Sequence, residues 1–300
     1  MIQPFDPNGR VFLITGGNSG IGFAAAQELA AKGAKVVLVC RDAQRAETAC
    51  ENLARAGARQ APEYVVLDLA SLASIRAGSD VICSRFPRVD VLINNAGLMA
   101  LPRTVTEDGF EAQIGVNHLG HFALTGLLLR VLRESPAPRV VTVSSLAHWF
   151  GRVRFNDLQG ERSYGKWTAY NQSKLANLLF SFELQRRCAA TMPELSSVAC
   201  HPGYAATNLQ LVGPQLERSP WLTSFFRVAN RFVARSPAYG AQPTIQAATG
   251  MVTGGTLIGP EYGSWGGIRT QRSSPASRST KLARQLWDLS VSLTGVDPGL

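Results

Sequence analysis

Tyr170 and Lys174 are four residues apart, in the segment Tyr170-Asn171-Gln172-Ser173-Lys174. On a helix this spacing places a phenol and an ammonium group on the same face. A free tyrosine has a pKa of about 10, which is too high for proton transfer at neutral pH, but a neighbouring positive charge favours the phenolate and lowers that pKa. The pair could therefore act as a general acid and base.

The segment from Ala169 to Leu184 predicts the helix that would carry this pair. Alanine, leucine, phenylalanine and glutamine predominate in it, and neither glycine nor proline interrupts it. Alone, the pair could also be two surface residues of an amphipathic helix. The elements elsewhere in the chain decide between these interpretations.

A glycine-rich turn near the start of the chain predicts a dinucleotide site. Val11 to Ile14 is an apolar run typical of a strand, Thr15 to Gly22 follows it, and Ala24 to Lys32 predicts a helix. Glycines let the backbone turn tightly and approach a pyrophosphate, which the free N–H groups at the helix N-terminus would bind. Here the glycines are spaced GxxxGxG rather than GxGxxG. We assign cofactor binding to Gly16, Asn18, Ser19, Gly20, Ile21 and Gly22.

The next strand, Lys35 to Val39, bears on the choice of cofactor. In NAD sites an acidic residue near the end of this strand binds the ribose 2′-hydroxyl. Here Cys40 and Arg41 follow the strand, and the first carboxylate is Asp42. An arginine can pair with a 2′-phosphate, which a carboxylate would repel. The sequence predicts that NADP(H) is preferred over NAD(H), although Arg41 could also be a solvated loop residue.

Strands and helices continue to alternate as far as residue 203. Further strands are predicted at Tyr64 to Leu67, Val89 to Ile93, Val140 to Val143 and Ser197 to Cys200, with a long helix from Phe110 to Leu132. Residues that follow parallel strands line the crevice where a ligand binds. We therefore place Asp68 and Leu69 near the adenine of the cofactor, and Asn94, Ala96 and Gly97 in the crevice.

This alternation predicts an α/β fold with a Rossmann-type, doubly wound parallel sheet. No internal repeat or long linker divides the chain, so residues 1–300 are expected to form a single domain. Residues 1–9 would be an N-terminal extension, residues 10–203 the dinucleotide-binding and catalytic core, and residues 204–300 a variable substrate lid and C-terminal segment.

From Val11 to about Gly203 the chain resembles the short-chain dehydrogenase/reductase family. Six motifs occur in the order that the family has: Thr15 to Gly22, Asn94-Asn95-Ala96-Gly97, Asn117, Ser144-Ser145, Tyr170 with Lys174, and Pro202-Gly203. Within the family, Val116-Asn117-His118-Leu119-Gly120-His121-Phe122 and Gln172-Ser173-Lys174-Leu175-Ala176-Asn177 resemble the retinol-dehydrogenase-like branch. That branch also contains WW-domain oxidoreductases and, more distantly, protochlorophyllide reductase.

The resemblance implies a role for each catalytic motif residue. Tyr170 would be the acid and base, Lys174 would lower its pKa and bind the nicotinamide ribose, and Asn117 would hold a water in the proton relay. A serine hydroxyl would stabilise, with Tyr170, the oxygen whose charge develops during hydride transfer. In the paired serines of the family the second is catalytic, so Ser145 is assigned over Ser144. Ser145 lies 25 positions before Tyr170 instead of the usual thirteen, which implies an insertion at about residues 148–165.

The resemblance also assigns Tyr170, Lys174, Pro202, Gly203 and Thr207 to cofactor contacts, with Thr207 holding the carboxamide. It weakens beyond Gly203. In Trp221 to Val233 apolar residues recur near helical spacing, and arginines four apart form another stripe. We expect this helix to be a lid over an apolar substrate; the alternatives are a helix on a membrane surface and a helix packed on the core.

The last third of the chain is expected to hold few further elements. Leu257 to Pro260 would be the last strand, Gly263 to Ser279 a mobile loop rich in Gly, Ser and Arg, and Lys281 to Leu293 a final amphipathic helix.

The amino-acid composition argues against several classes of protein. The net charge is +9 with a pI of about 9.7, but no run of Lys and Arg is interleaved with aromatics, which argues against nucleic-acid binding. No apolar run is long enough for a transmembrane helix, and no signal peptide is expected.

The five scattered cysteines indicate reduced thiols of a cytoplasmic protein. The four histidines lack the spacing of metal ligands, so no metal is expected and they are interpreted as packing or crevice residues.

We therefore expect an NADP(H)-dependent oxidoreductase acting on CH–OH groups. Hydride would pass between the nicotinamide and a hydroxyl or carbonyl of a small apolar substrate that is retinoid-, steroid- or lipid-like. The alternative is a dinucleotide-binding regulatory or membrane-surface scaffold protein without turnover, but a pure binder needs no proton relay, and Asn117, Ser145, Tyr170 and Lys174 are all present. Peripheral membrane contact and a homodimer or homotetramer remain open.

Overall fold

The computed structural model describes residues 5–203, 236–263 and 265–300. Eight strands form one sheet in the order β3-β2-β1-β4-β5-β6-β7-β8. Their bounds are β1 Val11–Thr15, β2 Lys35–Cys40, β3 Glu63–Val66, β4 Val91–Asn94, β5 Arg139–Val143, β6 Ser196–Cys200, β7 Leu257–Pro260 and β8 Ile268–Gln271. All neighbours pair in parallel except β7 and β8, which are antiparallel.

Helices connect the parallel strands, as parallel pairing requires. The bounds of the α-helices are α1 Gly20–Ala31, α2 Ala43–Arg55, α3 Leu72–Arg85, α4 Ala112–Ile114, α5 Gly120–Leu132, α6 Lys166–Thr191, α9 Pro237–Thr249 and α10 Thr280–Thr294. The strand order reverses between β1 and β4, which is the point where doubly wound sheets bind ligands. The predicted α/β fold with a doubly wound, predominantly parallel sheet is confirmed.

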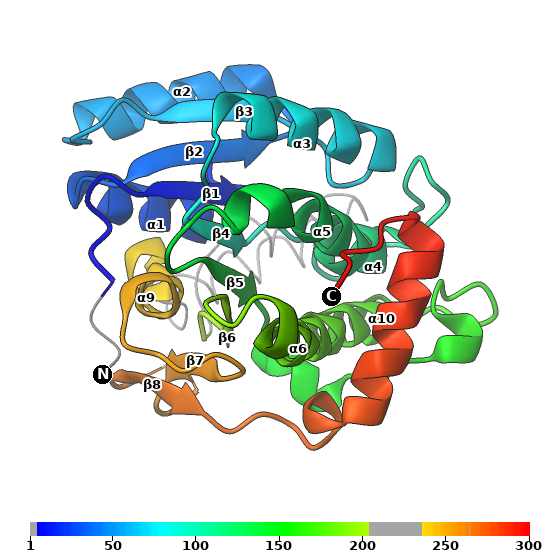
Figure 1. The fold of residues 1–300 in the computed structure, drawn as a ribbon. Helices are drawn as coiled ribbons and strands as arrows, with labels where there is room; N and C mark the ends of the chain where they lie inside the picture. Colours follow the sequence, from blue (N-terminus) through cyan, green and yellow to red (C-terminus); the bar gives the residue numbers. More distant parts are fainter. Residues whose placement is uncertain (1–4, 204–235, 264) are drawn as a thin grey trace, which may run out of the picture.

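Alternate side chains of the buried strands contact helices on opposite faces of the sheet. On β1, Leu13 packs in one apolar cluster with α3, α5, α6 and α10, whereas Phe12 and Ile14 pack in another with α1, α2 and α9. This two-residue period follows from strand geometry. Figure 1 shows the two groups of helices, with α10 lying alongside α6 on the side away from α9.

The predicted helix from Phe110 to Leu132 is not continuous. It consists of the short helix α4, a π-helical turn at Gly115–Leu119, and α5. A π turn inserts one extra residue per turn, and such turns are frequent at functional sites. Asn117 lies in this turn. Composition did not predict the break because the residues of the turn are compatible with an ordinary helix.

The expectation that residues 263–279 form a mobile loop is wrong, and so is the expectation that β7 is the last strand. This segment contains β8, which pairs with β7 from Leu257↔Gln271 to Pro260↔Ile268, and a 3₁₀ turn at Ala276–Arg278. Backbone pairing at the sheet edge supplies the order that the Gly-, Ser- and Arg-rich sequence does not indicate. The final helix is confirmed as α10.

Several predicted features lie outside the described residues. They are Thr207 and the expected lid helix, Trp221 to Val233. Among the helices of the described residues, none has the length and apolarity needed to cross a bilayer.

Candidate active site

Helix α6 brings Tyr170 and Lys174 onto one face, directed at the carboxyl end of β5. Both side chains are buried, and Lys174 Nζ lies 5.8 Å from the centroid of the Tyr170 ring. Lys174 Nζ also donates a hydrogen bond of 3.2 Å to the carbonyl oxygen of Val143, the last residue of β5. The strand end and the helix therefore fix the ammonium group next to the phenol.

Burial controls the pKa values of this pair. It raises the pKa of Tyr170 to about 12, and a hydrogen bond with the Ser145 side chain opposes that rise. Burial likewise lowers the pKa of Lys174 to about 8. Burial acts against the charged form of each residue, because it removes the water that would solvate the phenolate and the ammonium group. Tyr170 is a protonated phenol at neutral pH and is ready to donate.

The two serines after β5 have different environments. Ser144 Oγ is buried and donates a hydrogen bond of 2.7 Å to the main-chain carbonyl of Lys174, which ties β5 to α6. Ser145 is only partly buried, and its hydroxyl contacts the Tyr170 phenol. Ser145 Oγ also accepts a hydrogen bond of 3.2 Å from the N–H of Ala147 and so caps the 3₁₀ turn Leu146–Phe150. These contacts favour Ser145 over Ser144 as the donor beside Tyr170.

His148 holds the backbone of Ser145 in place. The N–H of Ser274 donates to His148 Nε2 at 3.3 Å, so the proton of the ring is on Nδ1, which donates to the Ser145 carbonyl oxygen at 2.6 Å. Burial lowers the pKa of His148, which keeps the ring neutral. Sequence reasoning missed this residue because Ser274 is 126 positions away.

Asn117 connects the π turn to the loop after β4. Its Oδ1 accepts a hydrogen bond of 2.7 Å from the N–H of Leu98, and its Nδ2 donates to the Leu98 carbonyl at 2.9 Å and to Ser173 Oγ at 2.8 Å. A Cβ atom on Gly97 would lie 3.1 Å from Asn117 Oδ1 and 3.5 Å from Lys174 Nζ. Gly97, Asn117 and Lys174 therefore meet at one point, as their assignment to one site predicts.

The glycine-rich turn has the conformation that close approach of a cofactor requires. Gly16 has a φ of 62°, in the left-handed region that favours glycine. A side chain on Gly22 would clash with the turn itself, because a Cβ atom there would lie 2.6 Å from the Gly16 carbonyl oxygen. The turn leads directly into the N-terminus of α1, which has no acidic residue in its first turn. This backbone cradle fits a pyrophosphate.

The end of β2 is followed by an exposed cation, Arg41, and by a carboxylate that has a structural role, Asp42. The buried Cys40 thiol accepts hydrogen bonds from the backbone of Asn18 and Gly17. Arg41 is exposed and has no ion pair among the described residues. Asp42 instead caps α2, accepting a hydrogen bond of 3.0 Å from the N–H of Arg45. The arrangement fits a 2′-phosphate better than a free 2′-hydroxyl.

The other predicted cofactor residues differ in position: some have side chains that serve the fold, and others lie in the crevice loop. Asp68 Oδ1 accepts from the N–H of Ala70 at 2.9 Å and shapes the turn after β3. Asn94 turns its side chain into the core, where Nδ2 donates to Thr125 Oγ1 at 3.0 Å, so only its main chain can face the crevice. Ala96 and Gly97 lie in the crevice loop, and Pro202 and Gly203 follow β6.

Thr15 and His121 join the cofactor turn to the π turn through a contact that the sequence did not predict. Thr15 Oγ1 accepts hydrogen bonds from the N–H groups of Asn95 and Ala96, at 2.8 and 3.0 Å, and lies 2.8 Å from His121 Nε2. Because those two bonds fill its lone pairs, Thr15 donates to Nε2, and Nδ1 carries the ring proton. The position of His121, one helical turn after Asn117, was the signal that could have identified it.

The remaining histidines do not form a metal site. His118 is buried between Phe122 and Phe180, and its Nε2 lies 2.8 Å from Ser290 Oγ on α10. His201 Nδ1 accepts a hydrogen bond of 3.2 Å from the N–H of Gly203. Within the described part of the chain no group of three His, Cys, Asp or Glu side chains could hold a metal ion.

Exposed aromatic side chains lie on the two elements that carry Tyr170 and follow Ser145, the helix α6 and the 3₁₀ turn Leu146–Phe150. Trp167 contacts the Tyr170 ring edge-on at 6.2 Å between centroids, and 47% of Trp167 is exposed. Trp149 and Phe150, in the 3₁₀ turn that Ser145 caps, are 46% and 80% exposed. Exposed aromatics on two elements beside the candidate catalytic groups indicate an apolar rim.

Comparison with known proteins agrees with this geometry. The sequence pattern of the short chain dehydrogenase family matches residues 10–213. Retinol dehydrogenase 14 of Homo sapiens is 40% identical over 302 residues, which cover 96% of this chain and 87% of that protein. The crystal structure of an uncharacterized protein from Mycobacterium paratuberculosis, 40% identical, superposes with a TM-score of 0.82 over 99% of this chain and 98% of that chain.

A more distant structure, Pseudomonas aeruginosa RhlG in complex with NADP, has a TM-score of 0.67 at 24% identity, over 87% of this chain and 99% of that chain. At this identity the likeness concerns the fold alone. The family pattern and the identity to a retinol dehydrogenase, together with the placement of Ser145, Tyr170 and Lys174, lead to one conclusion. The chain belongs to the short chain dehydrogenase family of oxidoreductases, in its retinol-dehydrogenase-like branch.

Proposed function

We propose that this protein is an NADP(H)-dependent oxidoreductase that interconverts a hydroxyl and a carbonyl group on an apolar, retinoid-, steroid- or lipid-like substrate. The observation that carries the proposal is the contact between Ser145 and the Tyr170 phenol, with the Lys174 ammonium group 5.8 Å from the ring. Two hydroxyl donors that meet at one point can hold the oxygen of a carbonyl group. A regulatory protein without turnover has no need of this arrangement.

The chemistry follows from the protonation states. The bound nicotinamide would supply or accept the hydride. In the direction of reduction, Tyr170 gives its proton to the substrate oxygen while Ser145 donates a hydrogen bond to the same atom. Lys174, held at Val143 O, provides the positive charge that stabilises the tyrosinate left behind. Because the pKa of Tyr170 is raised to about 12, reduction needs no prior ionisation, whereas oxidation requires loss of the phenol proton.

NADP(H) is preferred in this proposal because Arg41 is free to meet a 2′-phosphate and Cys40 occupies the place of a carboxylate. The related fold of RhlG binds NADP, which agrees with this choice. An apolar substrate is supported by the exposed rings of Trp149, Phe150 and Trp167, and by the name of the 40% identical retinol dehydrogenase 14.

The experiment follows NADPH absorbance with apolar aldehydes of increasing chain length. Wild-type protein should turn over, and Tyr170→Phe should lower kcat by about a thousandfold, because it lacks the proton donor. Trp167→Ala should raise KM for long aldehydes about tenfold more than for short ones, since burying one such ring is worth roughly 1.5–3 kcal/mol. The matched control is Met251→Ala, a residue 62% exposed outside the site. Turnover of none of these aldehydes, or full activity of Tyr170→Phe, would refute the proposal.

A further inference from the structure

A pocket lies away from the candidate active site, among α6, the β7–β8 pair and the start of α10. Its volume is about 340 Å³, which is at the lower end of ligand sites. From α6 it is lined by Phe182, Glu183 and Arg186, and Phe182 is twelve residues beyond Tyr170. At 1.5 Å per residue this is about 18 Å along the helix. The pocket is therefore separate from the proposed chemistry.

The walls of this pocket carry an excess of positive charge. Arg272, Arg278 and Arg186 line it together with a single carboxylate, Glu183. Glu183 is already committed, because Arg186 and Arg187 both pair with it. The side chains of Arg272 and Arg278 are exposed and have no ion pair or hydrogen-bond partner within the described part of the chain. Two guanidinium groups are thus available to an anion, and arginine forks match the oxygen geometry of phosphate.

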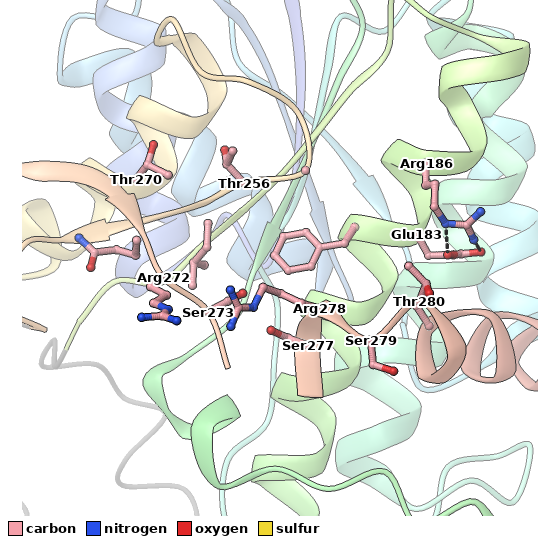
Figure 2. A pocket seen from close by; sticks show the side chains of 15 residues that line it. Glu183, Arg186, Thr256, Thr270, Arg272, Ser273, Ser277, Arg278, Ser279 and Thr280 are labelled. Atoms are coloured by element: carbon pink, nitrogen blue, oxygen red, sulfur yellow. Dashed lines mark hydrogen bonds and ion pairs between the residues drawn. The ribbon is translucent and has the colours of Figure 1, made fainter. Parts of the chain in front are cut away.

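Polar groups complete the lining. Ser273 stands between the two free arginines in the wall, is 5% exposed, and its hydroxyl has no hydrogen-bond partner among residues 5–203, 236–263 and 265–300. A hydroxyl without a protein partner at a pocket wall can bond a ligand atom. The first turn of α10 opens on the pocket at Ser279 and Thr280 and contains no acidic side chain, so its dipole also favours an anion. Figure 2 shows Arg272, Ser273 and Arg278 on the side of the pocket opposite Glu183 and Arg186.

We propose that this pocket binds a phosphate group, carried by a small molecule or presented by a lipid headgroup, through Arg272, Arg278 and the hydroxyl of Ser273. The inference does not depend on the proposed oxidoreductase activity, because none of these residues contacts Tyr170, Ser145 or the cofactor turn. Two arginine side chains without ion pairs among the described residues, a serine hydroxyl and a helix N-terminus meet at this one pocket.

The test measures binding of inorganic phosphate by calorimetry to full-length protein saturated with NADP⁺, which fills the phosphate contacts of the cofactor site. Buffers are matched in ionic strength with chloride. One saturable site is expected, and Arg272→Gln/Arg278→Gln should weaken it at least tenfold. Arg130→Gln, which removes an exposed charge on α5, is the matched control and should bind as wild type. Ser273→Ala should weaken binding by a smaller factor.

A second arm uses sedimentation with vesicles of phosphatidylcholine, with and without phosphatidylglycerol. Binding of inorganic phosphate that is lost in the double variant supports a small phosphorylated ligand. Binding only to the anionic vesicles, lost in the same variant, supports the headgroup as the source of the phosphate. The proposal is overturned if wild-type protein binds neither probe, or if the double variant binds as well as wild type. Activity of the double variant with NADPH should remain unchanged, which separates this outcome from a failure of the proposed function.

Discussion

His121 Nδ1 lies 3.1 Å from the main-chain carbonyl oxygen of Asn117 and donates a hydrogen bond to it. The other ring nitrogen is 2.8 Å from Thr15 Oγ1, at the start of the glycine-rich turn. Burial lowers the pKa of His121 to about 4, so the ring is neutral and each nitrogen keeps its role. One side chain therefore links the cofactor turn to the residue expected to hold a water of the proton relay.

We predict that His121 positions the Asn117 carbonyl. In His121→Asn the side-chain amide can still donate to that carbonyl, and kcat should stay within about threefold of wild type. His121→Gln reaches toward Thr15 instead, and kcat should fall about tenfold, which corresponds to about 1.4 kcal/mol. Kinetics with an apolar aldehyde, beside urea unfolding of both variants, measure this. Equal losses of kcat at equal stability would show that the ring only fills space.

The two serines after β5 should differ in what they affect. Ser145→Ala should lower kcat on the order of a hundredfold, the scale of one lost preorganised donor, with little change in NADPH affinity. Ser144→Ala removes the 2.7 Å bond to the Lys174 carbonyl and should lower the free energy of unfolding by about 1–3 kcal/mol. If Ser144→Ala is the inactive variant while Ser145→Ala works normally, the assignment is off by one residue.

Arg41 should decide the cofactor preference. Wild-type protein should bind NADPH more tightly than NADH, and Arg41→Ala should remove most of that difference, because its guanidinium group lies at the end of β2 and has no ion pair among the described residues. Fluorescence titration of both cofactors measures it. Arg45→Ala is the control, since Arg45 is exposed on α2 and already close to Asp42. If the Arg41→Ala variant still prefers NADPH, another residue determines the preference. If wild-type protein binds NADPH and NADH with equal affinity, the proposed NADP(H) preference is wrong.

All four histidines should make the fold sensitive to acid. Burial lowers the pKa of His118 to about 3, of His121 and His201 to about 4, and also lowers that of His148. Below the unfolded value of 6.5 the unfolded chain binds protons that the folded chain does not, so stability falls as pH falls. The loss is on the order of 1 kcal/mol per pH unit for each histidine.

Urea unfolding between pH 7 and pH 4.5 measures this dependence. His118→Gln is the matched variant, because its amide can still donate to Ser290 Oγ. In this variant the free energy of unfolding should fall less steeply with falling pH, because about one proton fewer is bound on unfolding. Parallel slopes for wild type and variant would mean that folding does not change the proton affinity of His118.

The sequence by itself determined the parallel strands of the sheet and the order of the site residues. Apolar runs of strand length, the glycine-rich turn and the Tyr170–Lys174 spacing are local patterns, because they depend on helical and strand periods and on the conformational freedom of glycine. The strands β1 to β6, the helix α6 and the cradle at Gly16 to Gly22 could be predicted from these patterns.

Other features depend on contacts between residues that are distant in the sequence, and only the tertiary structure determined them. Strand β8 exists because β7 offers it a backbone edge, although its own sequence is typical of a loop. The π turn at Asn117 was not evident from the sequence, and the roles of His121 and His148 depend on partners that are far away in the sequence, Thr15 and Ser274. The pKa of Tyr170 depends on burial, which needs the whole fold and raises that pKa.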